Sequence, residues 1–319
     1  MISVGVVGVG NMGRNHLRVL KKLEWESGEV RVEAIMDVRR DIVDRYSNMY
    51  GCRGYIDIEK FIRSEDLDGV VVSVPTHLHR EVATYLIENG INLLIEKPMA
   101  KDSVDARYIY DLSRRYNVKI LVGHIERFNP AVRTMKNLVK NGEIGRVITV
   151  SARRVGPGGI DIEGFDKKIG VTMDLAIHDL DIFQFLLDRY IDRIVIYSGS
   201  MLKPYEYEDY SFTIAYINKV IGLSEANWLT PYKLRKLYLT GTEGVYELDY
   251  ISQKLLYSRE MGSEPNEIPV NKVEPLYNEL KHFINVLKDV ETPEVGAEDA
   301  YRLITLIETG MKNHVTNKI

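Results

Sequence analysis

A lysine followed by a proline ends a short apolar run in the first third of the chain. Residues 92–96 read Asn-Leu-Leu-Ile-Glu, and Lys97 and Pro98 follow them. Such a run predicts a strand buried in a parallel sheet, and open α/β sheets bind ligands at the carboxyl edge of their strands. Proline fixes its own backbone angle, so the chain beside the lysine is stiff. The alternative is an ordinary exposed lysine at a strand end.

A carboxylate and an imidazole form a second candidate for chemistry. Residues 170–181 have a helical pattern, and side chains four positions apart, such as Asp174 and His178, share a helix face. A carboxylate can fix the tautomer of an imidazole and raise its basicity, which suits proton transfer near neutral pH. Taken alone, the residues favour the simpler alternative of a solvated acidic face with one buried histidine. Asp181 is expected to have a structural role.

Cationic side chains gather on a predicted strand of the second half. Lys233 and Arg235 alternate onto one strand face, and Arg153 and Arg154 are expected to add charge nearby. Such cations could hold a diphosphate. A basic strand exposed to solvent explains them equally well.

A glycine-rich loop near the amino terminus is the first element that must position Lys97. A β-branched run over residues 2–7 precedes it, and a helical pattern follows it. The loop has the pattern G-x-G-x-x-G and consists of Gly8, Val9, Gly10, Asn11, Met12 and Gly13. In this context the glycines permit a tight turn and a close approach to a pyrophosphate at the helix N-terminus. The sequence therefore predicts a dinucleotide cofactor.

An acid follows the next predicted strand, residues 32–36. Asp37 has roughly the spacing, about 20 residues, expected of the carboxylate that binds the adenosine ribose of NAD. Arg39 and Arg40 follow at once and could accept the 2′-phosphate of NADP, or they could be solvated charges that open the next helix. We predict NAD as the cofactor, with NADP possible.

The alternation of strands and helices sets the predicted architecture. Residues 1–122 predict an α/β doubly wound parallel sheet of the Rossmann type, with further strands over 68–74 and 118–122. Thr76 is expected to cap the helix over 77–89. Residues 123–319 predict an α+β domain with a large, mostly antiparallel open sheet, and the final helix, 297–312, is expected to pack back on the first domain. One face of that sheet needs a cover, so we expect a homodimer or homotetramer.

The strands of the second half are expected over residues 146–155, 193–198, 210–217, 221–229, 234–240 and 245–250. Turns at residues 218–219 and 241–244 join neighbouring ones.

Three motifs in this order make the chain resemble the glucose–fructose oxidoreductase and inositol dehydrogenase (Gfo/Idh/MocA) family. They are the glycine loop, the run Val74-Pro75-Thr76-x-x-His79 and the run Glu96-Lys97-Pro98. The resemblance covers essentially the whole chain. It implies that Lys97 is catalytic beside the nicotinamide. Further residues implied to contact the cofactor are Pro75, Thr76, His79 and Glu96.

The resemblance also assigns residues to the substrate. It implies substrate contacts for Arg127 and Asn129, and both substrate-binding and catalytic roles for Asp174 and His178. Residues 123–130 and 228–233 resemble the family's sugar-nucleotide members, in particular UDP-N-acetylglucosamine 3-dehydrogenases. For those members Lys233 and Arg235 would hold the diphosphate of the substrate.

The expected activity is therefore an NAD(P)-dependent oxidation of a sugar hydroxyl, at the 3-position of a UDP-N-acetylglucosamine-like substrate. One alternative is a dehydrogenase of free polyols, such as an inositol 2-dehydrogenase. A second is a sensor that binds NAD(P) and a sugar without turnover. A third is a variant that cleaves glycosides through bound NAD and produces no net NADH.

Composition excludes several other classes. The net charge of −4 argues against a nucleic-acid binder. Cys52 is the only cysteine, which rules out an internal disulfide and a cysteine-based zinc site. His77 and His79 would diverge around a helix, so we expect no metal site there. The apolar start is too short for a signal or a membrane span, and we expect a cytoplasmic protein.

Overall fold

The computed structural model describes residues 1–157, 169–201, 207–259, 262 and 264–312. They divide into two compact units. The first comprises Met1–Gly123 and Leu276–Arg302, and the second comprises His124–Pro275 and the described residues from Leu303 onward. The first unit thus contains a late segment that the sequence-based division assigns to the second domain. The division of cofactor and substrate binding between residues 1–122 and 123–319 stays a prediction.

A six-stranded parallel sheet forms the first unit, as predicted, with the strand order β3-β2-β1-β4-β5-β6. Its strands are β1 (Ile2–Val7), β2 (Val30–Met36), β3 (Arg53–Tyr55), β4 (Gly69–Val72), β5 (Asn92–Glu96) and β6 (Ile120–Gly123). Its helices are α1 (Asn11–Ser27), α2 (Arg40–Tyr50), α3 (Ile58–Ser64), α4 (His79–Glu88), α5 (Ser103–Tyr116) and α8 (Pro275–Leu287). The carboxyl ends of β1, β4 and β5 lead directly into the three sequence motifs.

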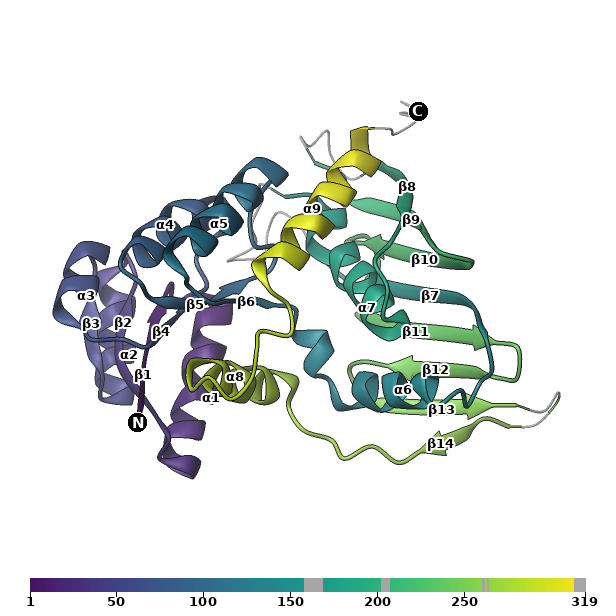
Figure 1. Ribbon diagram of the computed structural model, residues 1–319, viewed down its shortest axis with the longest axis horizontal. Coiled ribbons are helices and arrows are strands. Elements are labelled where there is room, and N and C mark those ends of the chain that lie inside the picture. The colour runs from purple at the N-terminus through teal and green to yellow at the C-terminus, as the bar shows by residue number, and fades with distance from the viewer. Residues whose placement is uncertain (158–168, 202–206, 260–261, 263, 313–319) are drawn as a thin grey trace. The chain divides into compact units, whose positions relative to one another are not determined.

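Helices cover both faces of this sheet. Figure 1 shows α1 and α8 on one side and α4 and α5 on the other. Tyr277 of α8 donates a hydrogen bond to Glu26 of α1 at 2.9 Å. A Cβ on Gly69 would lie 2.7 Å from Leu287, so α8 packs closely on the start of β4. The late segment is thereby part of the core of the first unit.

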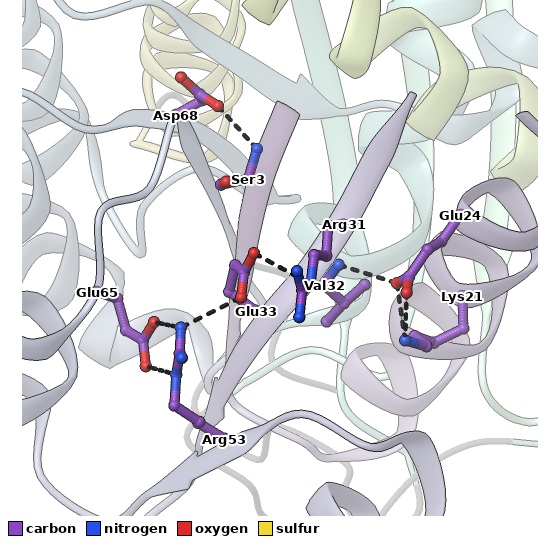
Figure 2. A network of polar contacts seen from close by, with 9 residues as sticks. All are labelled: Ser3, Lys21, Glu24, Arg31, Val32, Glu33, Arg53, Glu65 and Asp68. Atoms are coloured by element: carbon purple, nitrogen blue, oxygen red, sulfur yellow. Dashed lines mark hydrogen bonds and ion pairs between the residues drawn. The ribbon is translucent and has the colours of Figure 1, made fainter. Parts of the chain in front are cut away.

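Edge strand β3 was not predicted, because its three residues, Arg-Gly-Tyr, contain no apolar run. Ion pairs hold it in place (Figure 2). The Arg53 guanidinium donates to Glu65 at 2.6 Å and to Glu33 of β2 at 3.2 Å. Arg53 therefore attaches the edge strand to its neighbour through side chains as well as through the main chain.

The helix after β4 begins later than predicted. Thr76–Leu78 form a 3₁₀ turn, closed by a hydrogen bond from the Leu78 amide to the Pro75 carbonyl at 2.8 Å. Helix α4 then starts at His79 without a side-chain cap. The prediction that Thr76 caps this helix is wrong.

An eight-stranded sheet forms the second unit, in the order β14-β13-β12-β11-β7-β10-β9-β8. Its strands are β7 (Val147–Val155), β8 (Arg193–Gly199), β9 (Tyr210–Ile217), β10 (Val220–Asn227), β11 (Leu234–Gly241), β12 (Val245–Asp249), β13 (Lys254–Ser258) and β14 (Asn266–Ile268). Strands β7 and β10 run parallel and the other neighbours antiparallel, which confirms the mostly antiparallel sheet. The predicted hairpin turns join β9 to β10 and β11 to β12.

The two faces of this sheet differ. Helices α6 (Pro130–Lys140) and α7 (Ile177–Leu187) lie against one face (Figure 1). The last helix of the chain, α9, spans Ala297–Lys312. Large exposed apolar side chains, all on the opposite face by their strand register, are Tyr197, Phe212, Ile221, Leu223 and Tyr238. Among the described residues, no helix is long and apolar enough to cross a membrane.

Candidate active site

The three glycines of the first loop meet different needs. Gly8 has a φ of +87°, and a Cβ there would lie 2.7 Å from the Val74 amide nitrogen. A Cβ on Gly13 would lie 1.9 Å from the Gly8 carbonyl oxygen. A Cβ on Gly10 would have no atom within 4 Å, although this residue immediately precedes α1. The protein's own packing requires the outer glycines, and the middle one leaves room at a helix N-terminus for a pyrophosphate.

Two polar residues that sequence reasoning missed support this loop. The Ser73 hydroxyl, at the end of β4, donates to the Gly8 carbonyl at 2.7 Å. Arg14 donates to the Gly10 carbonyl at 3.1 Å and also to the side-chain oxygen of Asn11. Asn11 and Met12 themselves are exposed on the first turn of α1. A cation in this turn adds to the positive character that favours a phosphate.

The carboxylate of Asp37, at the end of β2, is buried and accepts several hydrogen bonds from the protein. It accepts hydrogen bonds from the Val9 amide at 2.8 Å and from the Arg39 amide and guanidinium at 3.0–3.1 Å. Burial raises the pKa of Asp37, but the hydrogen bonds from Arg39 and Val9 outweigh it and hold the pKa below its ordinary value. An ionised Asp37 at this position suits a ribose hydroxyl and repels a 2′-phosphate.

His79 holds the chain around Lys97. Its Nδ1 lies 3.1 Å from the Pro98 carbonyl oxygen, and its Nε2 lies 2.9 Å from the Val74 carbonyl oxygen. Burial lowers the pKa of His79, and a neutral ring donates only one of these bonds. Pro75 is exposed and Thr76 is buried. The cofactor contacts of these three residues stay predictions, and His79 gains a positioning role.

Lys97 follows β5 and is half-buried, and its peptide bond to Pro98 is cis. The Glu96 carboxylate accepts a hydrogen bond from the Lys97 amide at 3.2 Å and lies 2.7 Å from His16 Nε2. Burial raises the pKa of Glu96, but the bond from His16 and the charge of Lys97 lower it below its ordinary value. His16 lies on α1, one turn after Gly13, and was missed because an isolated histidine on a helix carries no motif of its own.

Asp174 and His178 do not lie on one regular α-helix. Thr172–Ala176 form a π-helical turn, and α7 begins at Ile177. The π turn was not predicted, and such turns are frequent at functional sites. The shared face of Asp174 and His178 stays a prediction. Asp174 accepts a hydrogen bond from the Trp228 indole at 3.3 Å. His178 is buried with its ring edge-on to His124, at 6.5 Å.

Arg127 and Asn129 have protein partners. The Arg127 guanidinium binds Asp181 through two bonds of 2.9 and 2.7 Å. Burial raises the pKa of Asp181, but the positive charge of Arg127 outweighs this and holds the pKa below its ordinary value. Asn129 caps α6 through the Ala131 amide at 3.1 Å and donates to the Tyr250 carbonyl at 3.1 Å. Their substrate contacts stay predictions, and these bonds give both residues structural roles.

A buried ion network lies on the helix-covered face of the second sheet. Arg154 is only 1% exposed, and its guanidinium donates to Asp179 and to Glu126, each at 2.9 Å. Ser224 donates to the second oxygen of Asp179 at 2.9 Å. Burial raises the pKa of Asp179 above its ordinary value, despite the opposing charge of Arg154. Sequence reasoning missed Glu126 and Asp179, because neither has a motif that distinguishes it from a surface acid.

The two predicted cations lie beside this network. Arg235 is paired with Arg154 across β11 and β7, and its guanidinium lies 3.9 Å from Glu126. Repulsion from Arg235 is the main cause that lowers the pKa of Lys233, and burial adds to it. Burial is the main cause that lowers the pKa of Arg235, and repulsion from Arg154 adds to it. The prediction that Arg153 adds positive charge near Lys233 and Arg235 is wrong. Arg153 lies on the opposite face of the sheet and pairs with Glu225 at 2.8 Å.

The negative charge of Asp174 also acts on Arg235, which places the substrate candidates Asp174, Lys233 and Arg235 in one neighbourhood of the second unit. Within the described part of the chain, no group of three or more His, Cys, Asp or Glu side chains could hold a metal ion.

Comparisons with known proteins agree with this geometry. Residues 2–124 match the oxidoreductase family with an NAD-binding Rossmann fold, and residues 132–247 match the GFO/IDH/MocA C-terminal domain. The chain is 23% identical to myo-inositol 2-dehydrogenase of Thermotoga maritima, over 96% of this chain and 94% of that protein. It is 24% identical to scyllo-inositol 2-dehydrogenase (NAD(+)) of Bacillus subtilis, over 94% and 90%.

Solved structures show the same fold. UDP-N-acetylglucosamine 3-dehydrogenase from Acidithiobacillus ferrooxidans superposes with a TM-score of 0.84 at 19% identity, over 97% of this chain and 96% of that chain. The two family matches together cover about three quarters of the present sequence. The chain therefore belongs to the GFO/IDH/MocA oxidoreductase family and is an NAD-dependent dehydrogenase.

Proposed function

We propose that this dehydrogenase oxidises a secondary alcohol of a sugar nucleotide, the 3-hydroxyl of a UDP-N-acetylglucosamine-like substrate. One observation carries the proposal. Repulsion from Arg235, together with burial, lowers the pKa of Lys233, and Arg154, paired with Arg235 across β7 and β11, adds a third positive charge. An anion would relieve this repulsion, and a diphosphate supplies two charged groups that a lysine and an arginine can bind together.

The cofactor role of the first unit rests on residues that fit NAD. Gly10 leaves room for the pyrophosphate, and ionised Asp37 suits the ribose of NAD. When bound, NAD supplies the hydride acceptor. Asp37 and the glycine loop bind and orient it. Glu96 and His79 hold the main chain on either side of Lys97, which fixes the point from which the lysine side chain extends.

Lys97 and His178 are the two groups that we assign to the hydroxyl proton. Oxidation of an alcohol removes one hydride and one proton, and a positioned base accelerates the proton transfer. Lys97 must first give up its own proton, which the carboxylate of Glu96 opposes. We assign Asp174 to binding and orientation, and its bond to Trp228 fixes its position beside Arg235.

A second candidate is a dehydrogenase of free polyols. The names of the inositol dehydrogenases to which the chain is similar favour it. A free polyol carries no phosphate, so this activity would have no use for Lys233 or Arg235.

The test is an absorbance assay of reduced nicotinamide. Purified protein is offered NAD or NADP with UDP-N-acetylglucosamine, free N-acetylglucosamine or myo-inositol, and any ketone is trapped. Signal only with the nucleotide sugar is the expected result. Signal with myo-inositol alone would establish the second candidate. If none of the three gives a signal although titration shows that NAD binds, both proposals are overturned. That result would favour the sensor, or the variant that cleaves glycosides without net production of NADH.

We also propose that a second copy of the chain covers the open face of the eight-stranded sheet. Phe212 on β9, Leu223 on β10 and Tyr238 on β11 are exposed there, and patches of this kind mark interfaces. Two ion pairs lie on this face, Lys236 with Glu247 and Arg153 with Glu225. Light scattering should give a dimer or tetramer, and Leu223→Glu should lower the mass without changing NAD affinity. A monomeric wild type would contradict the proposal.

A further inference from the structure

Glu279 is a carboxyl group enclosed in the core of the first unit. It lies on α8, which packs on β4 through Phe283 and Leu287. Glu279 is 0% exposed, and neither of its side-chain oxygens has a hydrogen-bond partner among the described residues. An isolated carboxylate is costly to bury, so such groups usually keep their proton.

The charged neighbour of Glu279 is Glu96. Burial is the main cause that raises the pKa of Glu279 well above its ordinary value, and the negative charge of Glu96 raises it further. Glu96 in turn is ionised and bound to His16 of α1 and to the Lys97 amide. Elements α1, α8 and β5 thus bring an imidazole and two carboxyl groups together behind Lys97.

We propose that Glu279 is a positioning residue that stays protonated and thereby limits the group behind Lys97 to the single negative charge of Glu96. The role in turnover rests on the proposed function of Lys97, whereas the protonation of Glu279 does not. Two buried carboxylates in one place repel each other strongly, and one of them then holds a proton. The geometry makes Glu96 the ionised member, because His16 and the Lys97 amide bond to it, and makes Glu279 the neutral one.

A second negative charge at Glu279 would act on Lys97 through Glu96. It would favour a proton on Glu96, which would weaken the bonds of the Glu96 carboxylate with His16 and with the Lys97 amide. It would also strengthen the hold of Lys97 on its own proton, which opposes the role of a base. Neutral Glu279 keeps Glu96 free to orient Lys97 without adding to that opposition.

The test compares wild type with Glu279→Gln, which has nearly the same shape and cannot ionise. Glu81→Gln, an exposed position in the same unit, is the matched control. Infrared difference spectra should show the carbonyl stretch of a buried protonated acid in wild type and in Glu81→Gln, and should lack it in Glu279→Gln. Absence of that band from wild type near neutral pH would overturn the proposal.

The pH dependence of stability provides a readout that needs no substrate. Folding raises the pKa of Glu279. Its contribution to the stability of the folded state is therefore fully present when the pH is below the pKa of this group in the unfolded chain, and it is lost as the pH rises through the pKa in the folded chain. The Tm of wild type should therefore fall relative to Glu279→Gln as pH rises from about 5 to about 9, whereas Glu81→Gln should track wild type. Parallel curves for Glu279→Gln and wild type would contradict the proposal.

Turnover then tests the positioning role. Glu279→Gln should bind NAD as wild type does and keep kcat within about threefold near neutral pH, but its kcat should fall less at alkaline pH. Glu279→Asp, which can still ionise, should restore the alkaline fall. An identical pH profile of kcat in wild type and Glu279→Gln would remove Glu279 from positioning Lys97. If wild type turns over no substrate, the proposed function fails while the spectra and Tm values still decide the protonation of Glu279.

Discussion

The two units treat buried charge in opposite ways. In the first, two carboxyl groups, Glu96 and Glu279, are buried near one another, and the proposed catalytic lysine follows one of them. In the second, a buried cation, Arg154, is held by two carboxylates, and two further cations lie beside it. The carboxyl groups near Lys97 affect how strongly this lysine holds its proton, whereas the cations that lie near one another favour the binding of an anion. In the proposed function, the first unit therefore controls the proton of Lys97, and the second unit recognises the anion.

Replacement of the lysine should have the largest effect. Lys97→Met should lower kcat by about 10²–10⁴-fold, the usual contribution of a positioned acid or base, while NAD affinity stays within about threefold. Rates and a cofactor titration measure the two effects. The control is Lys101→Met, an exposed lysine of the same unit that pairs with Asp105 at 3.5 Å. Retained turnover in Lys97→Met would remove the lysine from the mechanism.

The ion network of the second unit predicts a large loss of stability. Arg154→Met should lower the free energy of unfolding by about 3–5 kcal/mol, because it leaves Asp179 and Glu126 buried without their cation. The neighbouring Arg153→Met removes a partly exposed pair and should cost no more than about 1 kcal/mol. Urea denaturation measures both. Equal losses would show that the network does not carry the stability of this unit.

The carboxylate at the end of β2 should set the choice of cofactor. Asp37→Ser should raise the Kd for NAD by about 10–100-fold, since a hydrogen bond to a charged group contributes about 1.5–3 kcal/mol. The same change frees Arg39 from its pair with Asp37 and should improve NADP binding. Fluorescence titration with both reduced cofactors measures this, with exposed Asp41→Ser as the control. A wild type that prefers NADP would contradict the assignment.

The smallest effect is expected at the start of α6. Asn129→Ala removes a helix cap and should cost about 1 kcal/mol of stability, with kcat/KM unchanged if Asn129 is purely structural. Thr134→Ala, a hydroxyl bonded within the same helix at 2.9 Å, is the control. A fall in kcat/KM well beyond the loss of stability would restore the predicted substrate contact and enlarge the recognition site of the second unit.

Much of the fold could be predicted because its signals are local. Apolar runs and the glycine loop identify the parallel sheet, and the two-residue turn at 218–219 pairs β9 with β10. Strand β3 could not be predicted, because its stability comes from ion pairs of Arg53 with residues distant in sequence. The π turn at Thr172–Ala176 has no sequence periodicity that distinguishes it from an α-helix.

The residues that bind the site residues could not be predicted from the sequence either. His16 and Glu96 are 80 positions apart, and Arg154 and Asp179 are 25 apart. Motifs identify which residues carry chemistry, whereas the buried groups that hold them become visible only when the chain is folded.

The most direct measurement is kcat/KM of the double variant Lys233→Met and Arg235→Met on UDP-N-acetylglucosamine and on myo-inositol. Lys236→Met is the matched control, because Lys236 lies on the opposite face of the same strand and pairs with Glu247. We expect the double variant to lose about 100-fold in kcat/KM on the nucleotide sugar, since two charged contacts are removed. NAD affinity should be unchanged, and Lys236→Met should behave like wild type. Undiminished kcat/KM on the nucleotide sugar, or an equal loss on myo-inositol, would contradict the claim that the second unit recognises a diphosphate.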